Sequence, residues 1–188
     1  MDDKAGKPQA GLSVSRSGIR SVFLVGFMGA GKTSVGRALG QRLGWHFVDV
    51  DQRIQEREGR SIEQIFEQSG ESGFREVEHS CLQDVVAESN SSPRIVALGG
   101  GAYVQTKNAE LLANAGMTVV FLDGPVEELF RRCQQEQVTR PLRREMKQFR
   151  DLYEKRQPTY AKADLRIDTN GKDIERVTAE IAARLGLS

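Results

Sequence analysis

A glycine-rich turn that ends in a lysine and a threonine is the stretch of this sequence with the clearest chemistry. An apolar run over 22–25 leads into a segment, residues 26–34, that reads GFMGAGKTS and fits the spacing G-x-x-x-x-G-K-[ST]. Glycines let the main chain press its N–H groups against phosphate oxygens, and a helix beginning there favours an anion. Lys32 can bridge the outer phosphates and the hydroxyl of Thr33 can ligate Mg²⁺. The pattern predicts a nucleoside triphosphate site formed by Gly29, Ala30, Gly31, Lys32, Thr33 and Ser34.

Two aspartates follow the next apolar segment. Residues 45–48 read as a second strand, and the period of two places Asp49 and Asp51 on one side of its carboxyl end. Open α/β sheets bind ligands at that edge. Two carboxylates beside a phosphate site require a cation between them, unless one of them faces another substrate. The alternative is that Asp51 only caps the helix expected over 52–58.

The next helical region carries an arginine and two further polar candidates. Residues 61–64 read as a capping box, and glycines over 70–73 interrupt the helix that it opens. In the longer helix expected from residue 74, Arg75 and Glu78 are three residues apart and share a face. Spacing alone favours a solvated surface pair over a ligand site. His79 has no partner at metal-ligand spacing, and we expect it on the surface.

Three consecutive glycines follow a buried strand over 94–98. Gly99, Gly100 and Gly101 are costly in backbone entropy, and the usual reason for accepting that cost is a ligand close to the main chain. A loose turn is the alternative. The next strand, over 118–123, ends at Asp123 as a Walker B segment would, but Gly124-Pro125 also makes this aspartate a good helix start. We therefore interpret Asp123 as structural.

Charge is concentrated in one region. Residues 131–156 hold seven Arg and two Lys against four acidic residues, although the net charge of the chain is +1. Beside a triphosphate site, the polar stretch over about 134–147 is expected to be a mobile lid that closes over the phosphates and excludes water. Aromatic interleaving is sparse there, so we expect no nucleic-acid partner.

Composition fits one globular domain. The 188 residues are 38% hydrophobic and 28% charged, and neither cysteine has disulfide or metal spacing, which favours a reducing cytoplasm. No apolar run approaches the roughly 20 residues of a membrane span, so we expect no membrane partner. Residues 1–19 are polar and aperiodic, and are expected to be a disordered extension before a domain over 20–188.

Strands alternate with helices along the chain, which predicts a parallel sheet with right-handed crossovers. The last strand is expected over 165–168, and the final helix should turn four apolar residues inward: Ile174, Val177, Ile181 and Leu185. The fold class expected is α/β, a three-layer α/β/α sandwich with a five-stranded parallel sheet of the P-loop kinase type, carrying a mobile lid.

These segments together resemble the shikimate kinase family. They occur in that family's order over residues 20–185, and comprise the phosphate loop, DVD at 49–51, GFR at 73–75, LGGGA at 98–102, TRPL at 139–142 and RxPxY at 156–160. The resemblance implies that ATP phosphorylates the 3-hydroxyl of shikimate, in the cytoplasmic route to aromatic amino acids. It implies ATP, Mg²⁺ and shikimate as ligands.

Roles for single residues follow from the resemblance by position. Thr33 and Asp49 would hold Mg²⁺, and Lys32 would hold the phosphates. Asp51 would accept hydrogen bonds from the substrate hydroxyls and act as the base. Within a substrate-binding segment over about 51–82 and beyond it, Arg75 and Arg156 would clamp the carboxylate, beside backbone contacts from Gly99, Gly100 and Gly101. Arg140 in the lid would approach the phosphates and Arg132 would stack on adenine.

Other functions remain open on the sequence alone. Another small-metabolite kinase, such as a gluconate-type kinase, would share the phosphate loop but lack Arg75 and Arg156 around the glycines. A switch GTPase needs an N-K-x-D guanine reader, which residues 169–173 do not supply. A non-catalytic nucleotide-binding regulator would be expected to have lost Lys32, Asp51 or Arg140. Nothing in the pattern demands assembly, and we expect a monomer.

Overall fold

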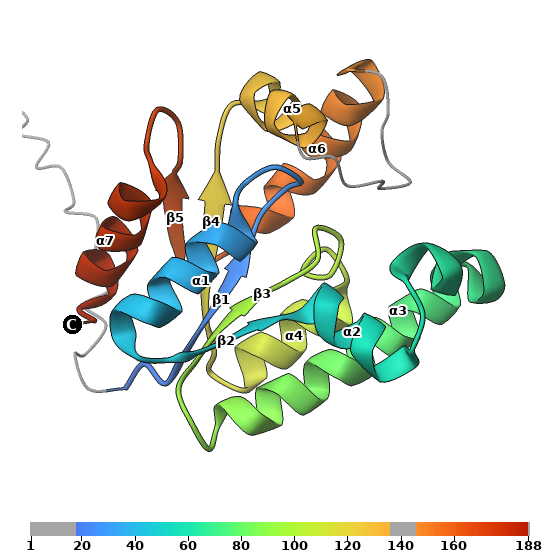
Figure 1. The fold of residues 1–188 in the computed structure, drawn as a ribbon, viewed down its shortest axis with the longest axis horizontal. Coiled ribbons are helices and arrows are strands. Elements are labelled where there is room, and N and C mark those ends of the chain that lie inside the picture. Colours follow the sequence, from blue (N-terminus) through green and yellow to red (C-terminus); the bar gives the residue numbers. More distant parts are fainter. Residues whose placement is uncertain (1–17, 136–145, 188) are drawn as a thin grey trace, which may run out of the picture.

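The computed structural model describes residues 18–135 and 146–187, and there a parallel sheet lies between layers of helices (Figure 1). The strands are β1 (Ser21–Val25), β2 (His46–Asp49), β3 (Arg94–Ala97), β4 (Thr118–Asp123) and β5 (Leu165–Asp168). The helices are α1 (Lys32–Leu43), α2 (Val50–Glu58), α3 (Ile62–Ser89), α4 (Thr106–Asn114), α5 (Val126–Gln135), α6 (Met146–Tyr160) and α7 (Ile174–Leu185). The three-layer α/β class expected from the alternating pattern is confirmed.

Strand order brings segments that are distant in sequence to one edge. The sheet runs β2-β3-β1-β4-β5 and every neighbouring pair is parallel. Ala97 of β3 is in register with Asp49 of β2 on one side and with Leu24 of β1 on the other. The carboxyl ends of these three strands are therefore level, and the loops that leave them meet above the same edge.

The central strand anchors the core. All five residues of β1 are buried, and Val22, Phe23 and Leu24 are fully so. Such a continuous apolar run is typical of a parallel strand covered on both faces. In Figure 1, α1 and α7 lie side by side on one face of the sheet, α3 and α4 lie on the other, and α5 and α6 stand beyond the carboxyl end of β4.

Several helix boundaries agree with the sequence signals. Gly31 precedes α1 with φ 82° and Gly44 ends it with φ 65°, both in the left-handed region that glycine tolerates best. Ser61 and Gln64 form the expected capping box, in which the Gln64 amide N–H donates to the Ser61 hydroxyl and the Gln64 side chain accepts from the Ser61 N–H. These local signals therefore fix where α1 ends and where α3 begins.

Three expectations about local structure were wrong. Helix α2 begins at Val50, so Asp51 lies in its first turn and not on an extended strand; Asp49 is the cap, because its side chain accepts from the N–H groups of Asp51 and Gln52. The break in α3 is confined to Gly70, and the helix resumes directly after it. Ile174 begins α7 and is 45% exposed, not inward.

Candidate active site

The phosphate loop joins β1 to α1, and the side chain of Lys32 folds back over the loop. The ammonium of Lys32 donates to the carbonyl oxygens of Gly26 at 2.9 Å and Phe27 at 3.1 Å. A cation is thereby placed among the main-chain groups at the beginning of α1, where the helix dipole already favours negative charge. This arrangement suits a phosphate chain, and it agrees with the sequence motif.

Helix α5 packs directly against this loop. A side chain on Gly29 would collide with the carbonyl of Leu129 and would come within 3.0 Å of the sulfur of Cys133. The same turn of α5 carries two arginines that both pair with Glu128. The Arg132 side chain is 27% exposed and that of Arg131 is 56% exposed, so Arg132 is the more enclosed of the two. Salt bridges to both arginines lower the pKa of Glu128 to about 2.

Two oxygen donors meet beside the loop. The hydroxyl of Thr33, in the first turn of α1, donates to Oδ2 of Asp49 at 2.7 Å, and Oδ1 of Asp49 is occupied by the α2 cap. Hydroxyl and carboxylate oxygens are hard ligands, and Mg²⁺ bound to a nucleotide usually takes only one or two protein groups, completing its shell with phosphates and water. The pair fits such an ion.

A carboxylate and two guanidinium groups converge on the glycine turn that follows β3. A Cβ on Gly99 would lie 2.5 Å from Oδ1 of Asp51, and one on Gly101 would lie 2.6 Å from Nη2 of Arg75. From α6, Nη1 of Arg156 donates to the carbonyl of Gly100 at 3.2 Å. The turn therefore consists of glycines because side chains at Gly99 and Gly101 would displace these charged groups.

Arg75 is fixed from its own helix. Its Nη1 donates to Glu78 at 2.8 Å and its Nη2 to Glu71 at 3.4 Å, while its Nε is buried with no hydrogen-bond partner among the described residues. A buried, unpaired N–H on a guanidinium favours a ligand that brings an acceptor. The arginine is thus held in place but not fully satisfied.

Glu78 is a residue whose importance the sequence did not indicate. It is only 1% exposed, so the prediction of a solvated surface pair with Arg75 was wrong. Burial raises the pKa of Glu78, the positive charge of Arg75 opposes the rise, and the charge of Asp51 adds to it. A carboxylate this close to two charged site residues acts as an anchor for Arg75.

Arg156 links the glycine turn to the phosphate loop. Its guanidinium lies 5.8 Å from the ring centre of Phe27, a residue of the loop, and contacts Gly100 on its other side. Tyr160, one turn further along α6, also donates its hydroxyl to the Gly100 carbonyl, and burial raises the pKa of this phenol to about 12. Arg156 therefore contacts both the glycine turn and the phosphate loop.

A grouping of one carboxylate and two arginines over a glycine turn, next to a phosphate loop, suits a small hydroxylated acid. The family model for shikimate kinase matches residues 28–186. The chain belongs to the shikimate kinase family. A shikimate kinase from Persephonella marina is 39% identical over 167 residues, covering 89% of this chain and 99% of that protein.

Other relatives agree with this family. A shikimate kinase from Geobacter metallireducens is 43% identical over 172 residues, covering 90% of this chain and 93% of its own. Among solved structures, the shikimate kinase from Acinetobacter baumannii in complex with shikimate superposes with a TM-score of 0.81 at 35% identity. The superposition covers 89% of this chain and 94% of the Acinetobacter baumannii chain. The P-loop kinase fold of shikimate kinases is therefore shown for this chain.

Most residues that the resemblance to shikimate kinase singled out lie on the phosphate loop, on the glycine turn after β3, or in contact with one of them. Arg140 and most of the expected lid over 134–147 lie outside the described residues, as does nearly all of the extension over 1–19. Ala30 is buried within the phosphate loop, whereas Ser34 is exposed on α1. Their assigned roles stay predictions.

Asp123 makes contacts that fit a structural role. It is buried at the end of β4 and accepts from the Gly124 amide at 2.8 Å and from the Tyr153 hydroxyl at 3.0 Å. Its other oxygen pairs with Arg166 on β5 at 2.6 Å. These partners tie β4, β5 and α6 together at the carboxyl end of β4.

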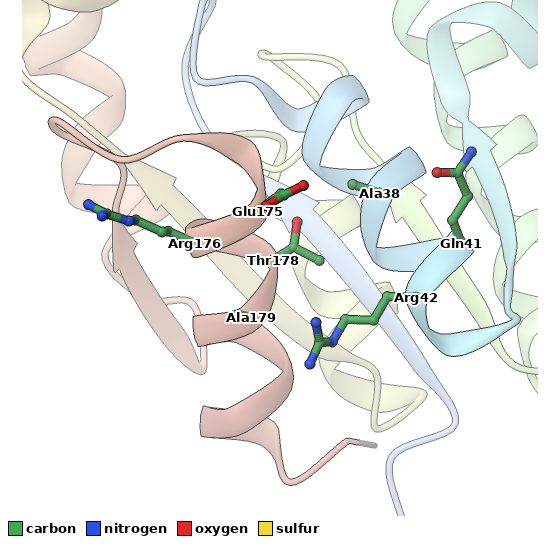
Figure 2. A pocket seen from close by; sticks show the side chains of 7 residues that line it. All are labelled: Ala38, Gln41, Arg42, Glu175, Arg176, Thr178 and Ala179. Atoms are coloured by element: carbon green, nitrogen blue, oxygen red, sulfur yellow. The ribbon is translucent and has the colours of Figure 1, made fainter.

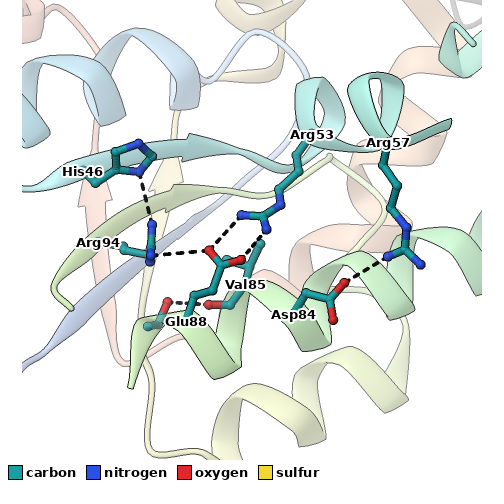
Figure 3. Close-up of polar contacts among 8 residues, drawn as sticks. His46, Arg53, Arg57, Asp84, Val85, Glu88 and Arg94 are labelled. Atoms are coloured by element: carbon teal, nitrogen blue, oxygen red, sulfur yellow. Dashed lines mark hydrogen bonds and ion pairs between the residues drawn. The ribbon is translucent and has the colours of Figure 1, made fainter. Parts of the chain in front are cut away.

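The helix that carries Asp51 is held on α3 by ion pairs far from the chemistry. Figure 3 shows Arg53 and Arg57 of α2 reaching Glu88 and Asp84 on α3. Glu88 also lies 3.4 Å from Arg94 at the beginning of β3. These pairs, together with the fully buried Ile54, join α2, whose first turn bears Asp51, to the rest of the fold.

A hollow lies away from this site. A groove of about 760 Å³ runs between α1 and α7 (Figure 2). It is lined by Ala38, Gln41, Arg42, Glu175, Arg176, Thr178 and Ala179, none of which belongs to the predicted site. Across residues 18–135 and 146–187, no helix has the length and apolarity to cross a membrane, and no group of three metal-binding side chains is found.

Proposed function

We propose that this protein transfers the terminal phosphoryl group of ATP to the 3-hydroxyl of shikimate, giving shikimate 3-phosphate and ADP. The observation that carries the proposal is the convergence of Asp51, Arg75 and Arg156 on one glycine turn beside the phosphate loop. Membership of the shikimate kinase family supplies the same substrate. The product belongs to the route to aromatic amino acids.

The acid is bound through complementary charge. Arg75 and Arg156 approach the turn from α3 and α6, and two guanidinium groups form a fork suited to one carboxylate. The unpaired Nε of Arg75 is a further donor for that carboxylate. Gly99, Gly100 and Gly101 contribute main-chain contacts, since no side chain separates their backbone from the ligand.

Asp51 is proposed to accept the proton of the reacting hydroxyl. Its carboxylate lies against Gly99, on the same turn that Arg75 and Arg156 reach, so an acid held by the two arginines presents its hydroxyls to this group. Phosphoryl transfer depends mainly on alignment and on stabilisation of the charge spread over the moving group. Asp51 aligns the alcohol, while Lys32 and, from the lid, Arg140 offset the negative charge.

The nucleotide is bound by residues 29–34 through their backbone, with Arg132 against adenine. Mg²⁺ is proposed to bind at the Thr33–Asp49 pair, whose 2.7 Å contact already gathers two oxygen ligands. Such an ion supplies charge neutralisation between the phosphates. We further propose a monomer that acts in the cytoplasm, with a lid over about 134–147 and a domain that begins near residue 20.

An ADP-release assay tests the function directly. Purified protein is supplied with ATP, Mg²⁺ and, in turn, shikimate, gluconate and nucleoside monophosphates, and the product is identified by phosphorus NMR. We expect ADP release only with shikimate, loss of turnover when Mg²⁺ is chelated, and phosphate on the 3-oxygen. Turnover with gluconate but not shikimate would show a gluconate-type kinase, and nucleotide binding without turnover would show a regulator.

A further inference from the structure

A buried asparagine joins the glycine turn to the helix that carries Arg75. Asn108, on α4, is completely buried, and its Nδ2 donates to the carbonyl of Ala102 at 2.9 Å. Its Oδ1 lies 2.6 Å from Nδ1 of His79 on α3. Since a carbonyl can only accept, the Asn108 amide nitrogen must face Ala102, and its oxygen must then face His79. His79 therefore carries its hydrogen on Nδ1, and it is half-buried against Asn108, whereas spacing predicted a surface residue without a partner.

Ala102 is the residue that closes the glycine turn. Its N–H donates to the carbonyl of Gly99 at 3.0 Å, and its own carbonyl accepts from Gln105 at 3.2 Å as well as from Asn108. On the opposite side, the carbonyl of Gly100 is held by α6. The turn is therefore held from two directions, and Asn108 is its side-chain attachment on the α4 side.

The histidine connects this attachment to Arg75. His79 lies four residues after Arg75 and directly after Glu78, so it shares the rigid helix that positions both. The guanidinium of Arg75 reaches Gly101, the neighbour of Ala102. Two links thus span the same gap between α3 and the turn: Arg75 at Gly101, which a ligand can engage, and His79–Asn108 at Ala102, which is protein only.

We propose that His79 and Asn108 are positioning residues that set the distance between Arg75 and the glycine turn, and thereby the affinity for shikimate. The proposal rests on the function proposed above, since it concerns the acid-binding half of that site. Without the pair, the turn keeps its contacts to α6 but loses the link to α3 that does not depend on Arg75. Arg75 and Arg156, which approach from different helices, then no longer meet one carboxylate at a fixed spacing.

Two variants break the pair and one restores it. His79→Leu removes the donor and leaves the buried Oδ1 of Asn108 unpaired, whereas Asn108→Asp replaces the donor to Ala102 with a carboxylate that faces a carbonyl. His79→Asn retains the contact, because the amide nitrogen of asparagine can occupy the place of Nδ1. His46→Leu is the matched control, since the His46 side chain contacts Arg94, at 3.3 Å, at the amino end of β2 and β3 and away from the glycine turn (Figure 3).

Steady-state kinetics well below the melting temperature, with calorimetric titration of shikimate into nucleotide-free protein, measure the effect. We expect His79→Leu and Asn108→Asp to raise the KM and Kd for shikimate about tenfold, with the KM for ATP and kcat changed less than twofold. His79→Asn and His46→Leu should stay within twofold of wild type. A merely structural role would lower the melting temperature without this selective shift, and that result, or no rescue by His79→Asn, would overturn the proposal.

Amide hydrogen exchange without any substrate separates this proposal from the proposed function. The Ala102 N–H, which donates within the turn, should exchange about tenfold faster in His79→Leu than in wild type. Its exchange rate in His46→Leu should equal that of wild type. If wild type failed to bind shikimate but this difference held, the function would be wrong and the positioning pair right. Equal exchange in all variants, or a variant that does not fold while His79→Asn also fails to fold, would refute the pair.

Discussion

The two halves of the site are built in different ways. The proposed nucleotide half lies mostly in one segment, since residues 26–34 supply the turn, the lysine and the threonine, while Asp49, Arg132 and Arg140 come from elsewhere. The proposed acid-binding half takes Asp51 from α2, Arg75 from α3, a turn after β3 and Arg156 from α6. The first depends on local backbone geometry, and the second depends on how whole elements are placed.

The two proposed halves should therefore respond differently to distant substitutions. A local loop keeps its shape as long as β1 and α1 stay joined, so distant substitutions should affect phosphate binding little. The acid-binding groups meet only because β1, β2 and β3 end level and because α2, α3, α4 and α6 are tied to that edge. Substitutions in these ties should change shikimate affinity selectively.

The largest effect should come from the base. Asp51→Asn keeps the size of the side chain but cannot accept a proton, so we expect kcat to fall by about 10²- to 10⁴-fold while the affinity for ATP stays within twofold. Rapid-quench turnover and nucleotide titration measure the two quantities. An equal loss of ATP affinity would mean that Asp51 belongs to the nucleotide half.

The next largest effect should come from the acid clamp. Arg75→Ala removes a charged donor from the carboxylate site, and we expect the KM for shikimate to rise about 10- to 100-fold with the KM for ATP unchanged. Arg75→Lys should recover only part of the loss, because an ammonium cannot form the fork. Unchanged shikimate affinity in the alanine variant would contradict the clamp.

A smaller effect should come from the ion pairs that hold α2. Arg53→Ala removes the partner of Glu88, in a pair whose side chains are each 34% exposed, and we expect a loss of about 1 kcal/mol in the free energy of unfolding. Arg57→Ala is the control, since its pair with Asp84 is more exposed and should cost less. Urea denaturation measures the loss of unfolding free energy in each variant. A larger loss in Arg57→Ala than in Arg53→Ala would mean that packing, and not the Arg53–Glu88 pair, holds α2 in place.

The smallest effect is a pH trend at Glu78. Burial raises the pKa of Glu78 in the folded protein above the ordinary 4.5. At pH values between 4.5 and this raised pKa, the folded protein therefore binds more protons than the unfolded chain. The stability of wild type relative to Glu78→Gln should therefore be greatest below pH 4.5 and should fall as pH rises through the raised pKa. Urea titrations from pH 4 to 8 test the sign, and a difference that grows with pH would reverse it.

The sequence was a good guide where one segment decides the structure. The phosphate loop, the capping box at Ser61 and the stop at Gly44 each follow from short-range backbone chemistry. The meeting of Asp51 with the glycine turn was also predictable, because parallel strands deliver their ends to one edge. The local conformation of the two aspartates was not predictable in this way. Asp49 is the N-cap of α2, and Asp51 therefore lies in the first turn of that helix.

What failed depends on packing between distant segments. Glu78 and His79 sit on a helix whose orientation is fixed by the break at Gly70 and by α4, so their burial could not be read from spacing. The partner of His79 lies 29 residues away on another helix. A hydrogen-bonded polar pair between two helices gives no periodic pattern in the sequence.

The carbonyls of the glycine turn have a consequence for how a molecule enters it. Those of Gly99, Gly100 and Ala102 each accept a hydrogen bond from the protein itself. The glycine turn should therefore offer a ligand mainly hydrogen-bond donors, while the carboxylate of Asp51, next to Gly99, is the acceptor. A ligand that carries a carboxylate at one end and hydroxyl groups at the other would therefore fit in one orientation only, with its carboxylate at the arginines and a hydroxyl at the aspartate.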